Sequence, residues 1–142
     1  MKKISVLVII LLSIIIGGGC SKNSFDSKEA QKVIEGEISG LKAISDETLE
    51  DVYGMDLSEM TEYTFKQNTD GDFYAIIKTD NIDGIKASMN DYFEKVQKFN
   101  TNYSPERIEI LEKRVEKEID DYLVYIVDEN ADEIYNKIIE KM

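Results

Sequence analysis

Carboxylates are the commonest side chains in this sequence that could carry out a reaction. Two adjacent pairs, Asp46/Glu47 and Glu50/Asp51, have the chemistry of a glycosidase couple, which needs two carboxyl groups about 5–9.5 Å apart across a cleft. Neighbouring residues on a helix point in different directions, so the sequence places neither pair in a cleft. The chain has no histidine, which excludes histidine-based triads and the usual catalytic zinc sites. We therefore expect a protein that is not an enzyme, with a carboxylate hydrolase as the alternative.

Two acidic segments have a superficial likeness to calcium-binding loops. Asp70-Gly71-Asp72 and Asp80–Gly84 (DNIDG) each combine aspartates with a glycine. Neither supplies the spaced carboxylates and the distal glutamate of a helix–loop–helix calcium site, and ordinary turn and cap chemistry explains both. We expect no metal site and no cofactor.

The only cysteine, Cys20, follows a segment with the composition of an export signal. Two lysines precede the apolar run Ile4–Ile16, which is shorter than the ~20 residues that a membrane-spanning helix needs. The small residues Gly17-Gly18-Gly19 separate this run from Cys20. The segment resembles a bacterial lipoprotein signal, in which the cysteine receives a diacylglyceryl group and becomes the first mature residue. The resemblance implies a signal peptide at 1–19, lipid on Cys20, and attachment to the outer face of the cell membrane.

The charge balance argues against nucleic acid as a partner. The first 19 residues hold two of the 17 basic residues and none of the 29 acidic ones, so residues 20–142 carry 15 bases against 29 acids, a net charge of −14. Phosphate backbones are bound by lysine and arginine, and the same surplus of acid disfavours docking of the protein surface on anionic headgroups. The mature length suits one domain, which we place at 27–142, after a lipidated cysteine and polar tether at 20–26.

Apolar residues spaced three and four apart predict five helices. In the second, Leu49, Val52 and Tyr53 form the inward face, and Gly54 ends the helix. The third is the clearest, with one apolar stripe that runs from Ile82 to Phe99. The last begins with a capping box of Asn130 and Glu133. The predicted helices start at Ser27, near Ser45 or Asp46, at Asp80 or Asn81, at Pro105 and at Asn130.

Alternating apolar residues predict the strands. Thr61–Gln67 and Asp72–Thr79 flank Asn68–Gly71, whose asparagine and glycine favour a hairpin loop. Residues 106–121 fit a helical period and, in their second half, an alternating one. We favour a short helix to about Lys113, then a strand that turns at Asp120-Asp121 into the apolar run that follows.

The predicted fold class is α+β. The order α-α-β-β-α-α-β-β-α gives a small antiparallel sheet of about four strands in two hairpins, with helices packed on one face. No disulfide is available to this fold because Cys20 is the only cysteine, so its core must hold it together.

Four short motifs carry a resemblance to a known family: Leu49–Asp56 (LEDVYGMD), Phe73–Lys78 (FYAIIK), Tyr103–Glu106 (YSPE) and Asp121–Val127 (DYLVYIV). With them, the chain from about Leu49 to Ile139 resembles the bacterial lipoprotein family catalogued as domain of unknown function 4358. The resemblance implies a small α+β domain behind a lipoprotein signal, typical of Gram-positive bacteria, with a strand at 114–120. It implies no known activity.

We therefore expect a membrane-anchored, extracytoplasmic module that binds an envelope protein or a peptide without catalysing a reaction. A shallow apolar groove or an uncovered strand edge would fit such a module, whereas a deep cleft with two facing acids would indicate the hydrolase. If the family motifs mark the contact surface, its residues are Tyr53, Gly54, Asp56, Tyr103, Pro105 and Glu106.

Overall fold

Five antiparallel strands form one sheet in the order β1-β2-β3-β5-β4 in the computed structural model, which describes residues 24–142. The expected signal peptide and Cys20 lie outside the described residues. The α+β class and both predicted hairpins are confirmed, and the two-residue β1 adds a fifth strand. The strands are β1 (Lys42–Ala43), β2 (Glu62–Gln67), β3 (Phe73–Lys78), β4 (Val115–Ile119) and β5 (Tyr122–Val127).

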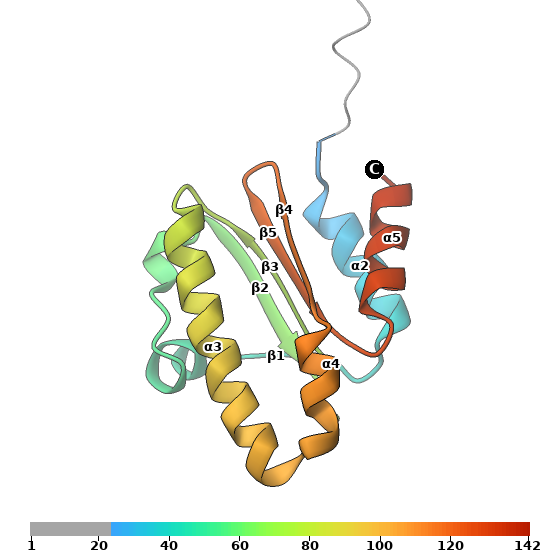
Figure 1. Ribbon diagram of the computed structural model, residues 1–142. Coiled ribbons are helices and arrows are strands. Elements are labelled where there is room, and N and C mark those ends of the chain that lie inside the picture. The colour runs from blue at the N-terminus through green and yellow to red at the C-terminus, as the bar shows by residue number, and fades with distance from the viewer. Residues whose placement is uncertain (1–23) are drawn as a thin grey trace, which may run out of the picture.

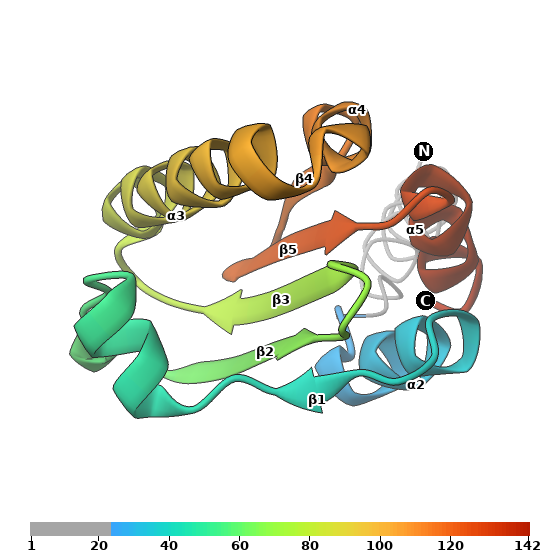
Figure 2. The same ribbon diagram turned by 90° about the horizontal axis from the view of Figure 1, so that it is seen from below.

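Helices cover both faces of the sheet, so the prediction that they lie on one face is wrong. The long helix α3 and the short α4 pack on one face, and α2 and α5 pack on the other, as Figures 1 and 2 show from two directions. The cause lies in β3, where Phe73 to Ile77 are all buried and alternate side chains enter opposite cores. A strand that is apolar on both sides requires cover on both sides. The helices are α2 (Ser27–Glu37), α3 (Ile82–Tyr103), α4 (Ile108–Glu112) and α5 (Ala131–Glu140).

Residues 106–121, which fit both a helical and an alternating period, contain a helix and then a strand, as predicted. Helix α4 ends at Glu112, and β4 pairs with β5 along its whole length. The turn between β4 and β5 places Asp120 at a φ of 54°, in the left-handed region that costs most side chains about 1 kcal/mol or more. The Asp120 carboxylate accepts the N–H of Phe25 at 3.2 Å, which ties this turn to the start of the domain.

The packed domain begins at Phe25, two residues earlier than predicted, because its ring is buried 5.0 Å from that of Tyr122. Asp26 rather than Ser27 caps α2, and its carboxylate accepts two backbone N–H groups of the first turn. The Asp26 N–H in turn donates to the sulfur of Met142 at 3.4 Å. The first and last parts of the described chain therefore meet at one end of the molecule.

The predicted cap of α3 is confirmed at Asn81, whose side chain accepts the N–H of Gly84 at 3.1 Å. The predicted capping box of α5 does not form. Asn130 makes no side-chain cap bond there, and its N–H donates instead to Asp128 Oδ1 at 2.7 Å. Within residues 24–142, the helices are all too short or too polar to cross a bilayer.

Candidate functional site

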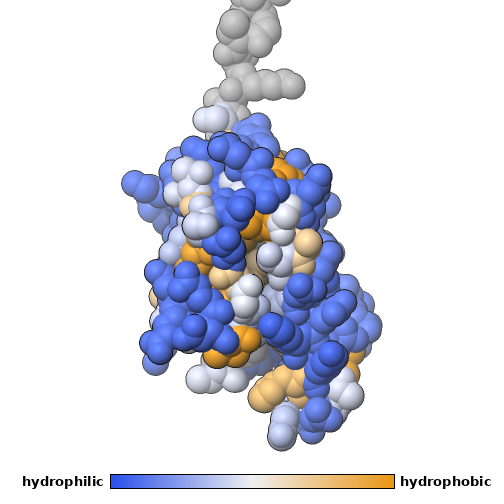
Figure 3. Space-filling view, turned by 90° about the vertical axis from the view of Figure 1, so that its left-hand side faces the viewer, coloured by the Kyte–Doolittle hydropathy of each residue, from blue (hydrophilic) through white to orange (hydrophobic). Residues whose placement is uncertain are grey.

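A groove of about 460 Å³ opens at the end of the molecule where α3 finishes and the β2–β3 loop turns. Its walls come from the turn before Gly54, the β2–β3 loop, the second half of α3, α4 and the end of β5. Figure 3 shows apolar patches among the hydrophilic residues of one side of the molecule, some of them toward this end. The lining residues are Val52, Tyr53, Gln67, Asn68, Thr69, Gly71, Phe73, Tyr92, Phe93, Lys95, Val96, Phe99, Asn100, Leu111 and Val127.

Stacked aromatic rings form the floor of the groove. The ring of Tyr92 lies 4.5 Å from that of Tyr53 and 5.1 Å from that of Phe73, and Phe93 meets Phe73 edge-on at 5.9 Å. Burial raises the pKa of Tyr92 far above its usual range, so its hydroxyl stays protonated. Such contacts add about 0.5–1.5 kcal/mol each beyond area burial, which makes the floor rigid.

Two large apolar side chains stand in water at the mouth of the groove. Val52 is 61% exposed and Phe99 is 60% exposed. The Phe99 ring contacts that of Tyr103, 73% exposed, at 4.8 Å. Val52, Phe99 and Tyr103 extend the apolar surface of the groove into solvent. Exposed apolar patches of this kind mark interaction sites.

The exposure of Val52 follows from the shape of the backbone around it. Thr48–Val52 forms a π-helical turn, in which the Tyr53 N–H donates to the Thr48 carbonyl five residues back. A wider turn shifts the angular position of each later side chain relative to an α-helix. Leu49 therefore stays buried as predicted, but Val52, expected beside it, points outward.

This turn is held against α3 by Lys95. Its ammonium donates to the carbonyl oxygen of Tyr53 at 3.1 Å, and the next residue, Gly54, has a φ of +68° that reverses the chain. The predicted role of Gly54 as a helix terminator is confirmed. Because Lys95 bonds to a backbone carbonyl, it fixes the position of Tyr53 whatever side chain that position carries.

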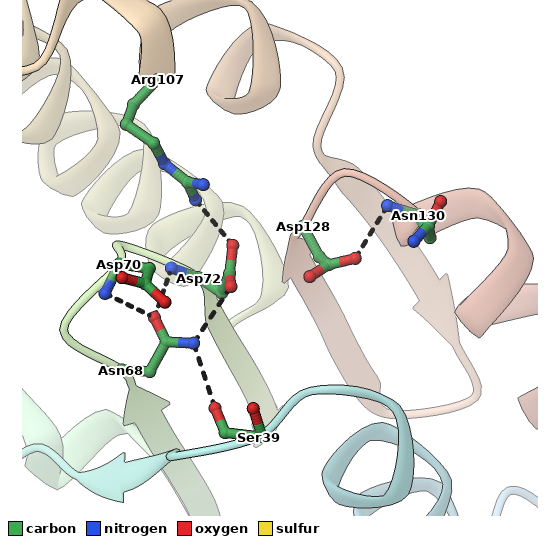
Figure 4. A network of polar contacts seen from close by, with 7 residues as sticks. All are labelled: Ser39, Asn68, Asp70, Asp72, Arg107, Asp128 and Asn130. Carbon is green, nitrogen blue, oxygen red and sulfur yellow. Dashed lines mark hydrogen bonds and ion pairs between the residues drawn. The ribbon is translucent and has the colours of Figure 1, made fainter.

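A polar network builds the opposite wall, on the β2–β3 loop (Figure 4). Asn68 Oδ1 accepts the N–H groups of Asp70 and Asp72, each at 3.0 Å, while its amide donates to the Ser39 carbonyl at 3.1 Å. The Asp72 carboxylate accepts from Asn68 at 3.0 Å and from Arg107 Nη2 at 2.7 Å. The loop, the connection between α2 and β1, and the residues before α4 are therefore locked together.

Asp128 lies beside this network, and its carboxylate is directed at the N–H of Asn130 in Figure 4. Burial raises the pKa of Asp128, and the neighbouring charge of Asp72 adds to the increase, whereas the Asn130 N–H and Arg107 act in the opposite direction. Both acids thus have structural partners. Asp72 anchors the loop and Asp128 holds the turn into α5.

A model of the family described as "Domain of unknown function (DUF4358)" matches residues 35–128, about two thirds of the chain. The chain belongs to that family. All residues that line the groove fall within the matched part of the DUF4358 domain, whereas α5 lies outside it. No curated protein and no solved structure matches the chain.

The DUF4358 domain brings only part of the predicted contact surface into the groove. Tyr53 lines it, and Gly54 follows directly. Tyr103, the last residue of α3, and Pro105 and Glu106, which follow it, are exposed and do not line the groove. Asp56 has a local structural task, because its carboxylate caps the Leu57–Glu59 turn and accepts the Ser58 N–H at 3.0 Å.

Sequence reasoning missed the two residues that most define the mouth of the groove in this DUF4358 domain. It treated Val52 and Phe99 as core positions, because both continue an apolar stripe. One signal was present for Phe99: α3 has 22 residues, and a helix of ~33 Å overreaches six-residue strands of ~20 Å. The last turns of such a helix have no sheet beneath them.

The acid pairs considered for hydrolysis, Asp46/Glu47 and Glu50/Asp51, are exposed and stand outside the groove. Asp46 accepts the hydroxyl of Tyr63 at 3.0 Å. Among the described residues, none of those that line the groove is an aspartate or glutamate, and no group of three or more potential metal ligands occurs.

Proposed function

We propose that this protein is a lipid-anchored interaction domain on the extracytoplasmic face of the cell membrane, which binds a partner in the groove and catalyses no reaction. The observation that carries the proposal is the groove itself. Its floor is aromatic, its mouth exposes Val52 and Phe99, and no acid lines it within the described part of the chain. Concave, mostly apolar sites with a few polar groups are the usual form of a binding site.

The proposed location at the membrane rests on the predicted signal peptide and on Cys20. A short basic head, an apolar run of limited length and small residues directly before a lone cysteine are what a lipoprotein signal requires. Two acyl chains hold a protein stably on a bilayer, whereas one holds it only marginally. A domain fixed in this way meets its partners at a membrane surface, where even a modest groove affinity is effective because the local concentration is high.

The groove favours binding over the hydrolase alternative. Hydrolysis by paired carboxylates requires two acids that face each other across the substrate. The candidate pairs lie in exposed positions outside the groove. Asp72 and Asp128, which adjoin lining residues in sequence, are engaged by Arg107 and by the Asn130 N–H. A hydrolase would need a different cleft from the one described.

Site-specific photo-crosslinking on intact cells tests the proposal. A benzoyl-phenylalanine in place of Val52 should form a discrete adduct of higher mass. The same probe in place of Ile139, 43% exposed on α5, is the matched control and should form none. Adducts of the same mass and yield from both positions, or from neither, would count against a binding role for the groove.

A further inference from the structure

The chain enters the folded domain at the end opposite the groove. Phe25 packs on Tyr122 and bonds to Asp120 at the β4–β5 turn. The same turn holds the end of β3, because the Thr79 N–H donates to the Asp121 carbonyl at 3.1 Å, and α3 starts three residues later. In Figure 1 the chain enters beside the β4–β5 turn at the top, and α3 ends at the bottom.

The length of chain between Cys20 and Phe25 limits which end can lie near the membrane. Five residues span at most ~18 Å when fully extended. Along α3, Phe99 lies 17 positions after Ile82, a rise of ~26 Å away from the entry end. An anchor on Cys20 therefore keeps the β4–β5 turn near the bilayer, and it leaves the mouth of the groove at the far end.

Charge around the groove indicates the kind of partner that suits it. Asp51, Asp70 and Glu94 each adjoin a lining residue in sequence, are exposed, and form no ion pair with the described residues. Two exposed bases, Lys95 and Lys98, lie in the same stretch, so the three acids outnumber them, and Lys95 is held by the Tyr53 carbonyl. An apolar segment with basic flanks would match this rim.

Resting on the anchored module proposed above, we infer that the groove faces away from the membrane and receives an apolar polypeptide segment of a partner protein, flanked by lysine or arginine. The bilayer is a poor occupant, because the tether holds the opposite end and the net charge of −14 for residues 20–142 repels anionic headgroups. A second copy is also a poor occupant, because a two-fold contact places the same acidic rim against itself.

The orientation is tested on the full chain in vesicles that carry an acceptor dye on their headgroups. Acylated Cys20 has no free thiol, so V52C and D121C each accept one donor dye. Energy transfer should be strong from position 121 and lost from position 52. Equal transfer, or more from position 52, overturns the orientation. If the wild-type protein takes up dye, Cys20 carries no lipid. That result would contradict the proposed lipid anchor and would leave the groove untouched.

The occupant is tested with three fluorescent peptides on the same membrane-bound protein. One has a leucine and phenylalanine core with lysine flanks, one has the same core with glutamate flanks, and one has a serine core with lysine flanks. The first should bind at least ~10-fold more tightly than the others, and its affinity should fall by a similar factor in V52S and F99S. Raising the salt concentration to about 1 M should weaken binding of this peptide, because the Debye screening length falls to ~3 Å at that concentration.

Three results overturn the assignment of the occupant. The first is equal binding of lysine- and glutamate-flanked peptides. The second is unchanged binding in V52S and F99S, with I139S as the control that should bind like the wild type. The third is a dimer of the peptide-free protein that V52S dissociates, which assigns the groove to a second copy.

Discussion

Arg107 Nη2 lies 2.7 Å from Asp72 Oδ1, and the two side chains are only 16% and 17% exposed. The residues are 35 positions apart. The pair joins the segment before α4 to the β2–β3 loop, and so connects the two walls that would otherwise be free to separate at the end of the groove.

Loss of Arg107 should destabilise the domain. Arg107→Ala leaves the Asp72 carboxylate partly buried without its cation, and the free energy of unfolding should fall by about 2–3 kcal/mol. Asp72→Asn in the same chain should recover part of the loss, because the uncompensated charge is then gone. Urea denaturation measures both. Lys113→Ala removes the Lys113–Glu109 pair, which is exposed, and should leave the urea midpoint almost unchanged.

Substitutions at the mouth of the groove should separate binding from stability. Val52→Ser and Phe99→Ser should change the free energy of unfolding by less than about 0.5 kcal/mol, since both side chains are mostly in water. Phe73→Ala in the floor should cost about 3–5 kcal/mol. If thermal denaturation shows that Val52→Ser unfolds the domain as Phe73→Ala does, then Val52 belongs to the core.

The glycine at the end of the π-helical turn should not tolerate a side chain. Gly54→Ala forces a β-carbon into a φ of +68° and should lower stability by about 1–2 kcal/mol. Gly36→Ala is the matched control, because that glycine lies inside α2 and an added β-carbon meets no atom within 4 Å. It should raise stability by about 0.5–1 kcal/mol. Equal effects at the two positions would contradict this account of the turn.

The raised pKa of Asp128 makes the free energy of unfolding depend on pH in a defined direction. Between its unfolded pKa, ~3.9, and its higher folded pKa, the folded state binds the proton more tightly. Stability from this group is therefore complete below the unfolded pKa and is lost as pH rises through the folded pKa. Asp128→Asn, which can still accept the Asn130 N–H, should be more stable than wild type at pH 7. The gain should vanish near pH 3, as thermal melts across pH would record.

Cys20→Ser should release the protein from the membrane into the medium. A serine side chain offers no thiol for the lipid, and without two acyl chains the attachment is at most weak and reversible. Fractionation of cells and medium with an immunoblot measures the change. If the variant remains with the membrane after a high-salt wash, the anchor lies elsewhere in the chain.

Much of the fold could be predicted because β3 and β5 are nearly continuous apolar runs and the β2–β3 loop has hairpin chemistry. The apolar strands β3 and β5 also indicate a sheet buried on both faces, which the prediction of helices on one face does not take into account. Tyr74 and Ile76 in β3 point away from α3 and need the cover that α2 and α5 provide. Burial on both faces of a strand is a stronger signal than helix order.

The groove was harder to predict for two physical reasons. A π-helical turn has no distinct sequence period, so the outward rotation of Val52 could not be predicted from a stripe of apolar residues. The Arg107–Asp72 pair joins residues 35 positions apart, and a contact of that range depends on how the β2–β3 loop meets the start of α4. Of the residues named from the family motifs, Tyr53 lines the groove and Gly54 follows it directly.

The tie between Phe25 and the β4–β5 turn also determines how mechanical load would pass through the domain. Tension on the membrane tether would enter through Phe25 and Tyr122 and would first load α2 and its neighbour α5. A partner held in the groove would pull on α3, on the other face. Any force between the two must therefore pass through the sheet from one face to the other, which puts the load on the side-chain packing of both cores.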